Sequence, residues 1–338
     1  MKAGEGALEA LLEDLRDDGQ AESSGGFSLD PARGFELLRT HLEPDTYVLH
    51  LVSAAILSGA GSLDIELDSD EFSLAWHPRE TVEASLLTRL DRYLLSAQSE
   101  QNLFLRELAI GLYAAAIDEP IELYLDSPVG RLSLVDHRPV LEPVQESSFR
   151  FYRRLGAQAR RLLQGLVNRF PEETVLRKRC RHAPVPIRVN GRPLPRAGEF
   201  ERVLYLTRSQ SAMVAFSRRE RQACSRLTWV VNGVDFPASA RGLAQAEVQI
   251  LGWSSSLITD LSERSLVRND HYLEARRQLK DLVDQAALQA AMTVPAQLTG
   301  RDGRGVLLMA ADRLRHQGRL GELATLYEYL LEDRARQL

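Results

Sequence analysis

The sequence predicts an α+β protein with more than one domain. Short runs with the period-2 alternation of strands come in hairpin pairs. Apolar helical runs lie between these pairs without the strict β-α-β order of a parallel sheet, and three consecutive helical runs close the chain. A length of 338 residues favours two domains of ordinary size over one.

Residues 1–28 are expected to form a flexible N-terminal segment. They contain one short helical run, "ALEALLEDLRDD", followed by "GQAESSGGFS", whose glycine and serine content is typical of a linker. The first domain is therefore expected to begin near Leu29, where Asp30 caps a helix with Pro31 in its first turn.

The first domain should alternate helices with hairpins. A helical run that ends at Gly59 and Gly61 precedes the first hairpin, and Asn190 followed by Gly191 predicts a tight primed turn near the end. The expected elements are helices at 30–42 and 43–60, strands at 62–67 and 72–76, helices at 80–96 and 101–117, strands at 121–125 and 131–135, basic helices within 150–181, and a strand within 183–194.

A composition shift between Pro193 and Gly198 predicts a domain boundary. Beyond it, strand-like runs surround a second Asn-Gly pair at 232 and 233, and Asn269 or Asp270 is expected to cap a long helix. Gly318 separates the last two helices. The expected elements are strands at 202–207, 212–217, 227–236 and 247–253, and helices at 269–291, 305–317 and 320–336.

Charge is unevenly distributed along the chain. The net charge is −5, yet residues 150–181 carry ten Arg or Lys against Glu172 and Glu173, which gives +8 and leaves −13 for the remainder. Such a segment could bind nucleic-acid phosphates. No aromatic stacking series or DNA-reading motif accompanies it, so we expect these arginines to solvate helix faces and to pair with the acidic remainder.

Composition excludes several other classes of protein. No apolar run is long enough to cross a bilayer and no signal peptide is recognisable, so we expect a cytoplasmic protein without a membrane segment. The cysteines Cys180 and Cys224 form no metal-binding pair and are expected to be reduced and structural. The seven histidines show no HxxxH or HExxH spacing, so no metal site is expected. Trp229 and Trp253 lie in expected strands and should belong to the core.

Four stretches carry a resemblance to a known superfamily. They are "HLVSAAILSGAGSLDIEL", "NLFLRELAIGLYAAAI", "RCRHAPVPIRVNGRPL" and "LITDLSERSLVRNDHYLEARRQLKDLV". Their order and hydrophobic spacing resemble the Bergerat-fold ATPases, which include DNA gyrase, MutL, sensor histidine kinases and, nearest, the ninety-kilodalton heat-shock chaperones. The resemblance implies a two-layer α/β sandwich over 29–195 and a transducer-like α/β domain over 196–295. The C-terminal helical hairpin at 296–338 is expected from the helical runs alone and lies outside the resemblance.

The resemblance also implies where nucleotide chemistry would lie. The family's basic glutamate, which activates water, corresponds to His50, and its magnesium-binding asparagine corresponds to Ala54, which has no side-chain oxygen. Trp76 stands where adenine would bind and is expected to plug that place. Gly111 alone remains of the lid glycines. The γ-phosphate arginine corresponds to Glu263, or to Arg264 with a shift of one residue.

These substitutions predict a vestigial nucleotide pocket formed by His50, Ala54, Trp76 and Gly111, with no catalytic residue and no cofactor. The predicted function is that of a pseudo-ATPase, a chaperone-like or scaffold protein that acts through protein partners. The alternative is a divergent ATPase that binds ATP and magnesium and uses Glu43 or Asp45 as its base. A weaker alternative is nucleic-acid binding through 150–181, and a homodimer stays open.

Overall fold

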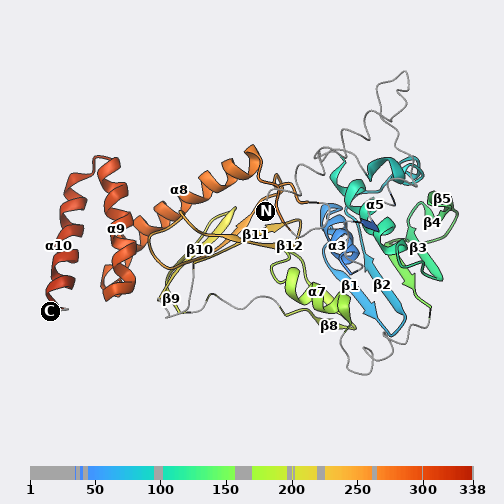
Figure 1. Cartoon of the computed structure of the whole chain (residues 1–338), viewed down its shortest axis with the longest axis horizontal. Coiled ribbons are helices and arrows are strands. Elements are labelled where there is room, and N and C mark those ends of the chain that lie inside the picture. Colours follow the sequence, from blue (N-terminus) through green and yellow to red (C-terminus); the bar gives the residue numbers. More distant parts are fainter. Residues whose placement is uncertain are drawn as a thin grey trace, which may run out of the picture. The chain divides into compact units, whose positions relative to one another are not determined.

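The computed structural model describes two compact units. It describes residues 35, 39–40, 45–94, 102–156, 170–195, 200, 202–218, 225–260, 265–298 and 300–336. The first unit comprises Met1–Lys178 and Pro184–Leu194, and the second comprises Arg179–Ala183 and Pro195–Leu338. Each unit has its own sheet and its own helices (Figure 1). The segment 1–28 lies outside the described residues, so its expected flexibility stays a prediction.

Unit 1 is built on an eight-stranded mixed sheet with the order β5-β4-β3-β6-β2-β1-β7-β8. All described pairings are antiparallel except the pairing of β1 with β7, which is parallel. The strands are β1 (Leu63–Leu67), β2 (Glu71–Trp76), β3 (Glu122–Ser127), β4 (Gly130–Val135), β5 (Arg138–Glu142), β6 (Phe149–Arg154), β7 (Ile187–Val189) and β8 (Arg192–Pro193). Both predicted hairpins are confirmed, and positive φ angles at Asn190 and Gly191 confirm the primed turn.

The helices of unit 1 pack on one face of this sheet. They are α3 (Tyr47–Leu57), α4 (Ala84–Leu87), the 3₁₀ turn η1 (Leu90–Tyr93), α5 (Leu103–Ala116) and α7 (Pro171–Arg179). Tyr47 of α3 packs edge-on against Phe72 of β2, and Phe104 of α5 packs against Phe149 of β6. Burial alternates along β1, β2 and β6, as a strand with one covered face requires. Unit 1 is therefore a two-layer α/β sandwich.

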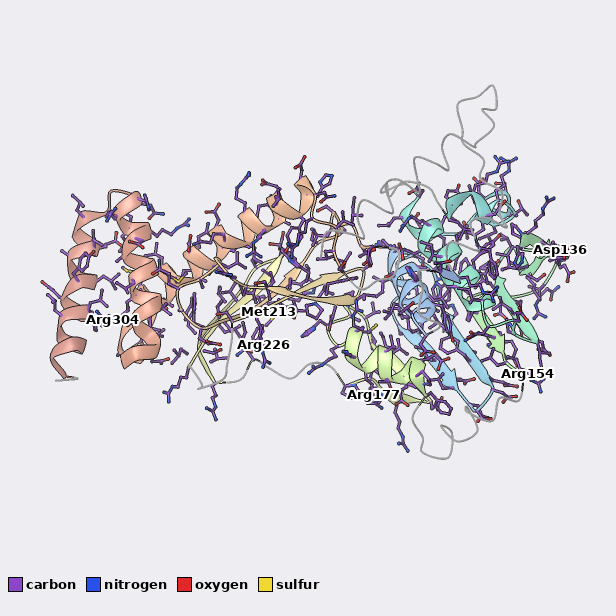
Figure 2. The ribbon with its side chains drawn as sticks, in the orientation of Figure 1. Asp136, Arg154, Arg177, Met213, Arg226 and Arg304 are labelled. Atoms are coloured by element: carbon purple, nitrogen blue, oxygen red, sulfur yellow. The ribbon has the colours of Figure 1, made fainter. Side chains whose placement is uncertain are left out.

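Two predicted helices of this unit are wrong in whole or in part. Of the predicted run 80–96, the described residues 80–94 form only α4 and η1, because Arg89 leaves the helical region with φ −120° and ψ 26°. The start of the basic segment is the central strand β6 rather than a helix, with Phe149, Phe151 and Arg153 on the covered face. Strand β5 was not predicted. Asp136, labelled in Figure 2, and His137 form its turn with positive φ angles, which non-glycine residues seldom adopt.

Unit 2 pairs a five-stranded sheet with three long helices. The sheet order is β12-β11-β13-β10-β9, with β11 and β13 parallel and the other pairs antiparallel. The elements are β9 (Val203–Arg208), β10 (Ala212–Ser217), β11 (Arg226–Val231), β12 (Val234–Ser239), β13 (Val248–Trp253), α8 (Asp270–Thr293), the 3₁₀ turn η2 (Pro295–Gln297), α9 (Gly300–His316) and α10 (Leu320–Arg336). Every predicted strand and helix of this region is present, which confirms the mixed α+β class.

Local signals account for the shape of unit 2. The side chain of Asn269 accepts a hydrogen bond from Tyr272 N and so caps α8, and Asn232 and Gly233 turn β11 into β12 with positive φ angles. Gly318, with φ +68°, separates α9 from α10, and the two form the expected hairpin beside α8 (Figure 1). Among the described residues, no helix combines the length and the apolar character needed to cross a membrane.

Candidate functional site

The helices that would line a nucleotide pocket are buried on all sides. In α3 the nine residues Tyr47 to Ala55 are consecutively buried, and in α5 the eleven residues Leu105 to Ala115 are. An amphipathic surface helix buries only one stripe. Helices α3 and α5 pack on each other and on the sheet, and so lie inside the core of unit 1.

Gly111 explains how closely these two helices approach. It lies in the middle of α5, and a Cβ atom added there would come within 2.8 Å of Leu51 Cδ2 and 3.2 Å of Leu51 N. Interior glycine costs about 1 kcal/mol of helix propensity relative to alanine. The structure therefore gives Gly111 a packing role between α3 and α5.

His50 forms a buried ion pair with Glu107 of α5. Its Nδ1 lies 2.7 Å from Glu107 Oε2, and Arg106 Nη1 donates to Glu107 Oε1 at 2.9 Å. The His50 and Glu107 side chains are 1% and 2% exposed. Burial alone would raise the pKa of the Glu107 carboxyl, but the charges and hydrogen bonds of His50 and Arg106 outweigh burial and hold this pKa below its ordinary value. Glu107 is therefore an ionised carboxylate inside the core.

Sequence reasoning missed Glu107 and Arg106 because nothing marks them locally. Glu107 is separated from His50 by 57 positions and sits in an otherwise apolar helical run. The available signal was an arginine and a glutamate within the run Leu105–Ala115, whose other residues carry no charge. A carboxylate in such a place needs a buried cation beside it.

A carboxylate that holds an imidazole is the arrangement that orients a catalytic base. In unit 1 that arrangement is closed to solvent, since both partners are buried. Ala54 and Ser53, one turn further along α3, are buried too. A base must reach the proton that it removes, directly or through one water molecule. The pair therefore holds α3 to α5 and offers no attacking position for water.

Trp76 fills the space at the end of β2. Its ring stacks on Phe149 with the centroids 5.1 Å apart and the planes 10° from parallel, and its Nε1 donates to Ser58 Oγ at 3.1 Å. The indole is 2% exposed. The Trp76 ring already stacks on Phe149 and its N–H is already hydrogen-bonded, so neither is available to the adenine ring of a nucleotide.

A second buried charged cluster lies around Arg153, which points inward from β6. Arg153 pairs with Asp118 through Nη2, and its Nη1 lies 3.8 Å from Glu172 Oε1 of α7. Tyr47 donates to Glu172 Oε1 at 3.3 Å, and the Arg153 guanidinium lies 4.7 Å from the centre of the Tyr47 ring. Burial acts to lower the pKa of Arg153, but Tyr47 and Asp118 raise it above its ordinary value. This cluster joins β6, α3 and α7.

Other arginines of the basic segment pair with acids at the surface. Arg154 lies 3.6 Å from Asp70 and 3.7 Å from both Glu71 and Glu122, and Arg177 lies 2.6 Å from Glu173. Both arginines are labelled in Figure 2. The acidic remainder of the chain thus neutralises part of this segment, as expected. Exposed pairs of this kind contribute little to stability, about 0 to 1 kcal/mol each.

The structure describes two of the other predicted residues, Asp45 and Cys180. Asp45 is half-buried in the turn before α3. Cys180 is buried, as predicted. The remaining candidates lie outside the described residues: Glu43, Cys224, Glu263, Arg264 and the arginines 160, 161 and 169.

Cavities of two sizes are lined by described residues of unit 2. A cavity of about 700 Å³ lies between the turn after β12, α8 and α9, and its charged lining includes the ion pairs of Lys280 with Asp284 (2.6 Å) and of Arg313 with Asp281 (3.7 Å). A cavity of about 110 Å³ is lined in part by Trp229 and Trp253. Trp229 is buried against Gly252, as predicted for a core residue, whereas Trp253 is half-buried. In the described part of the chain, no cluster of three metal-ligating side chains occurs.

Comparison with known proteins adds two solved structures. No family model and no curated protein matches the chain. The ATPase domain of the bacterial mismatch repair endonuclease MutL from Aquifex aeolicus is 14% identical, with an alignment over 70% of this chain and 98% of that one and a TM-score of 0.31. A point-mutant form of the same domain is 12% identical over 71% and 98%, also with a TM-score of 0.31. The resemblance to the Bergerat-fold superfamily, and to its chaperone branch in particular, stays a prediction.

Proposed function

We infer that this protein is a pseudo-ATPase: a cytoplasmic Bergerat-like domain that has lost nucleotide chemistry and acts by binding other proteins, as a scaffold or in a chaperone-like role. The observation that carries the proposal is the burial of His50 and its 2.7 Å pairing with Glu107. By the resemblance, His50 corresponds to the family's basic glutamate, and its burial in the core is what supports a loss of that role.

Three further features support the same proposal. Ala54 offers no oxygen to Mg²⁺, a cation that requires oxygen ligands. Trp76 stacks on Phe149 at the place where, by the resemblance, adenine would bind. Gly111 brings α5 against Leu51 instead of giving freedom to a lid. Any one change could be compensated from a neighbouring position, but all four act on the same pocket.

The alternative, a divergent ATPase, draws on one observation. Glu107 holds His50 as a carboxylate holds the histidine of an oriented base. Hydrolysis by this pair would need α3 and α5 to separate enough to admit water and Mg-ATP.

A phosphate-release assay with Mg-ATP separates the two functions. We expect purified protein to release phosphate no faster than buffer, and His50→Ala to behave as the wild type does. Loss of an oriented base commonly reduces a rate by about 10²- to 10⁴-fold. Turnover by the wild type that falls by such a factor in His50→Ala, with the variant still folded by circular dichroism, would establish the divergent ATPase.

Affinity purification from the native cell tests the binding role. We expect the same partner protein to be recovered with and without Mg-ATP. Recovery that requires Mg-ATP would show that nucleotide controls the interaction and would count against a pseudo-ATPase.

A further inference from the structure

The five-stranded sheet of unit 2 has two edges, β12 and β9. In an antiparallel pair, every second residue of an edge strand directs its N–H and C=O groups away from the neighbouring strand. Such outward groups can pair with another chain, and proteins usually block them. Whether these groups are occupied therefore shows whether an edge is open to a partner.

The outward groups of β12 are blocked. Counted from the tight turn between β11 and β12, the outward residues are Asp235, Pro237 and Ser239. Arg179 Nε donates to Asp235 O at 2.7 Å, and Arg276 Nη1 donates to Ser239 O at 2.8 Å. Pro237 has no N–H group to donate. The β12 edge is therefore closed.

In the part of the chain that the structure describes, the β9 edge is open between Tyr205 and Arg208. Ser209 N donates to Ala212 O, so the outward residues of this stretch are Leu206 and Arg208. No hydrogen bond between described residues uses the N–H or C=O group of either one. Unlike β12, β9 contains no proline. One edge of the sheet is thus blocked, whereas the other presents free main-chain groups.

The exposed side chains of β9 define the chemistry of what would pair with it. Leu206 and Val203 are 45% and 37% exposed. Arg202 and Arg208, at the two ends of the strand, are exposed, and Arg208 forms no ion pair with a described residue. A segment that is apolar in its middle and carries a carboxylate at each end complements this edge.

Only an extended backbone matches the spacing of the open groups. They recur at every second residue, as those of another strand do, whereas a helix uses its N–H and C=O groups internally. We propose that β9 binds an extended segment of a partner protein, apolar in its middle and acidic at its ends, as an additional strand of the unit 2 sheet. This inference rests on the proposed protein-binding role and assigns a surface to it.

The extent of the open edge limits the affinity. The register of β9 with β10 shifts between Phe216 and Ser217, which ends the regular ladder beyond Tyr205. The open stretch thus offers the main-chain groups of Leu206 and Arg208. We therefore expect reversible binding of an isolated peptide, with a dissociation constant of roughly 10 to 100 μM.

A fluorescent peptide of about seven residues tests the added strand. Valine and threonine alternate along it because β-branched residues favour strands, and a glutamate at each end complements Arg202 and Arg208. Its anisotropy on titration with the full chain should give a saturable curve. Binding should slow hydrogen exchange of the Leu206 and Arg208 amides more than that of the Thr207 amide, which already bonds to β10.

The variant Leu206→Pro removes an outward N–H and keeps the β9–β10 ladder, because proline is tolerated in edge strands. Its matched control is Leu206→Ala, which loses the same side chain and keeps the N–H. We expect the peptide to bind Leu206→Pro about tenfold more weakly than Leu206→Ala, with both variants folded by circular dichroism.

The variant Arg208→Glu tests the charges independently of the ladder. It should bind the glutamate-ended peptide several-fold more weakly than the wild type does, and a lysine-ended peptide more tightly. An Arg208→Glu variant that does not discriminate between the two peptides would contradict the acidic ends of the partner segment.

Other results would overturn the proposal as a whole. They are the absence of saturable binding to the wild type, equal affinities of Leu206→Pro and Leu206→Ala, and unchanged hydrogen exchange at Leu206 and Arg208. A wild type that dimerises in sedimentation equilibrium through an interface lost in Leu206→Pro would overturn it too, since a second copy of the chain would then occupy β9. Failure of the protein-binding function is distinguishable: if the wild type and Leu206→Pro recover the same partner from the native cell, that function stands and β9 is not its surface.

Discussion

The helix pairs α3/α5 and α9/α10 contrast in how they use their surfaces. The α3/α5 pair of unit 1 is buried all round and encloses the His50–Glu107 ion pair. The α9/α10 pair of unit 2 is buried less completely: α9 packs on α8 as well as on α10, and α10 leaves Leu320, Tyr327 and Leu331 exposed. The pair that the resemblance associates with a nucleotide pocket is core, whereas the pair outside the resemblance keeps exposed apolar side chains. The difference shows that burial alone sets the two helix pairs apart: α3 and α5 belong to the core of unit 1, whereas α10 lies at the surface of unit 2.

Replacing Arg153 should have the largest effect on unit 1. Arg153→Ala would remove the cation that pairs with both Asp118 and the buried Glu172. Breaking a buried ion pair costs about 3 to 5 kcal/mol. Chemical denaturation followed by tryptophan fluorescence measures the loss. Arg154→Ala is the matched control, since Arg154 is 44% exposed and should cost less than about 1 kcal/mol. Equal losses in the two variants would show that the Arg153 cluster is not a buried network.

Restoring the family's glutamate should damage the fold instead of restoring chemistry. His50→Glu would place a second carboxylate beside buried Glu107 and leave Arg106 as the only neighbour of the pair named here that carries positive charge, at a cost of about 3 kcal/mol. The double variant His50→Glu, Glu107→Gln removes the like-charge contact and should regain part of this stability. A stable His50→Glu single variant that gains ATPase activity would contradict a closed site.

A substitution at Gly111 tests how tightly α3 packs on α5. Gly111→Ala adds a methyl group 2.8 Å from Leu51 Cδ2, and overpacking of this kind costs about 1 to 3 kcal/mol, partly offset by better helix propensity. Gly61→Ala is the control, because nothing lies within 4 Å of a Cβ at Gly61. Thermal melts of the two variants should separate. If Gly111→Ala is as stable as Gly61→Ala, the two helices are not tightly packed.

The smallest expected effect is a decrease in the free energy of unfolding as the pH falls. The pKa of Glu107 is lower in the folded protein than its ordinary value of 4.5, so its contribution is fully present above that ordinary pKa and is lost as the pH falls through the folded pKa. Denaturation at neutral and acidic pH should show a steeper loss for the wild type than for Glu107→Gln. Parallel losses would mean that Glu107 is not stabilised by His50 and Arg106.

Much of the fold could be predicted because local signals are strong. The Asn-Gly pairs at 190 and 232, the cap at Asn269 and the glycine at 318 each act within a few residues, and all were found in place. Strand β6 was missed because Arg153 stands on its inward face, where alternation leads one to expect an apolar residue. Its partners Asp118 and Glu172 are 35 and 19 positions away, so the neutralising contact has no local signature.

The candidate site was predictable only in outline. The resemblance was enough to predict that His50 and Ala54 stand in place of the family's glutamate and asparagine. It was also enough to predict that Trp76 fills the space where adenine would bind. The pairing of His50 with Glu107 could not, because it depends on how α3 and α5 pack across 57 positions. The packing role of Gly111 has the same origin, since a helix–helix approach leaves no mark in either helix alone.

Isothermal titration calorimetry with Mg-ATP tests the central claim, that the nucleotide site of unit 1 is closed. We expect no saturable heat on titration of the purified full chain to about 1 mM nucleotide, which corresponds to a dissociation constant weaker than millimolar. Filled space around His50, Trp76 and Gly111 is the physical reason. A saturable one-to-one isotherm with a micromolar dissociation constant would contradict the account and show that α3 and α5 open to admit the nucleotide.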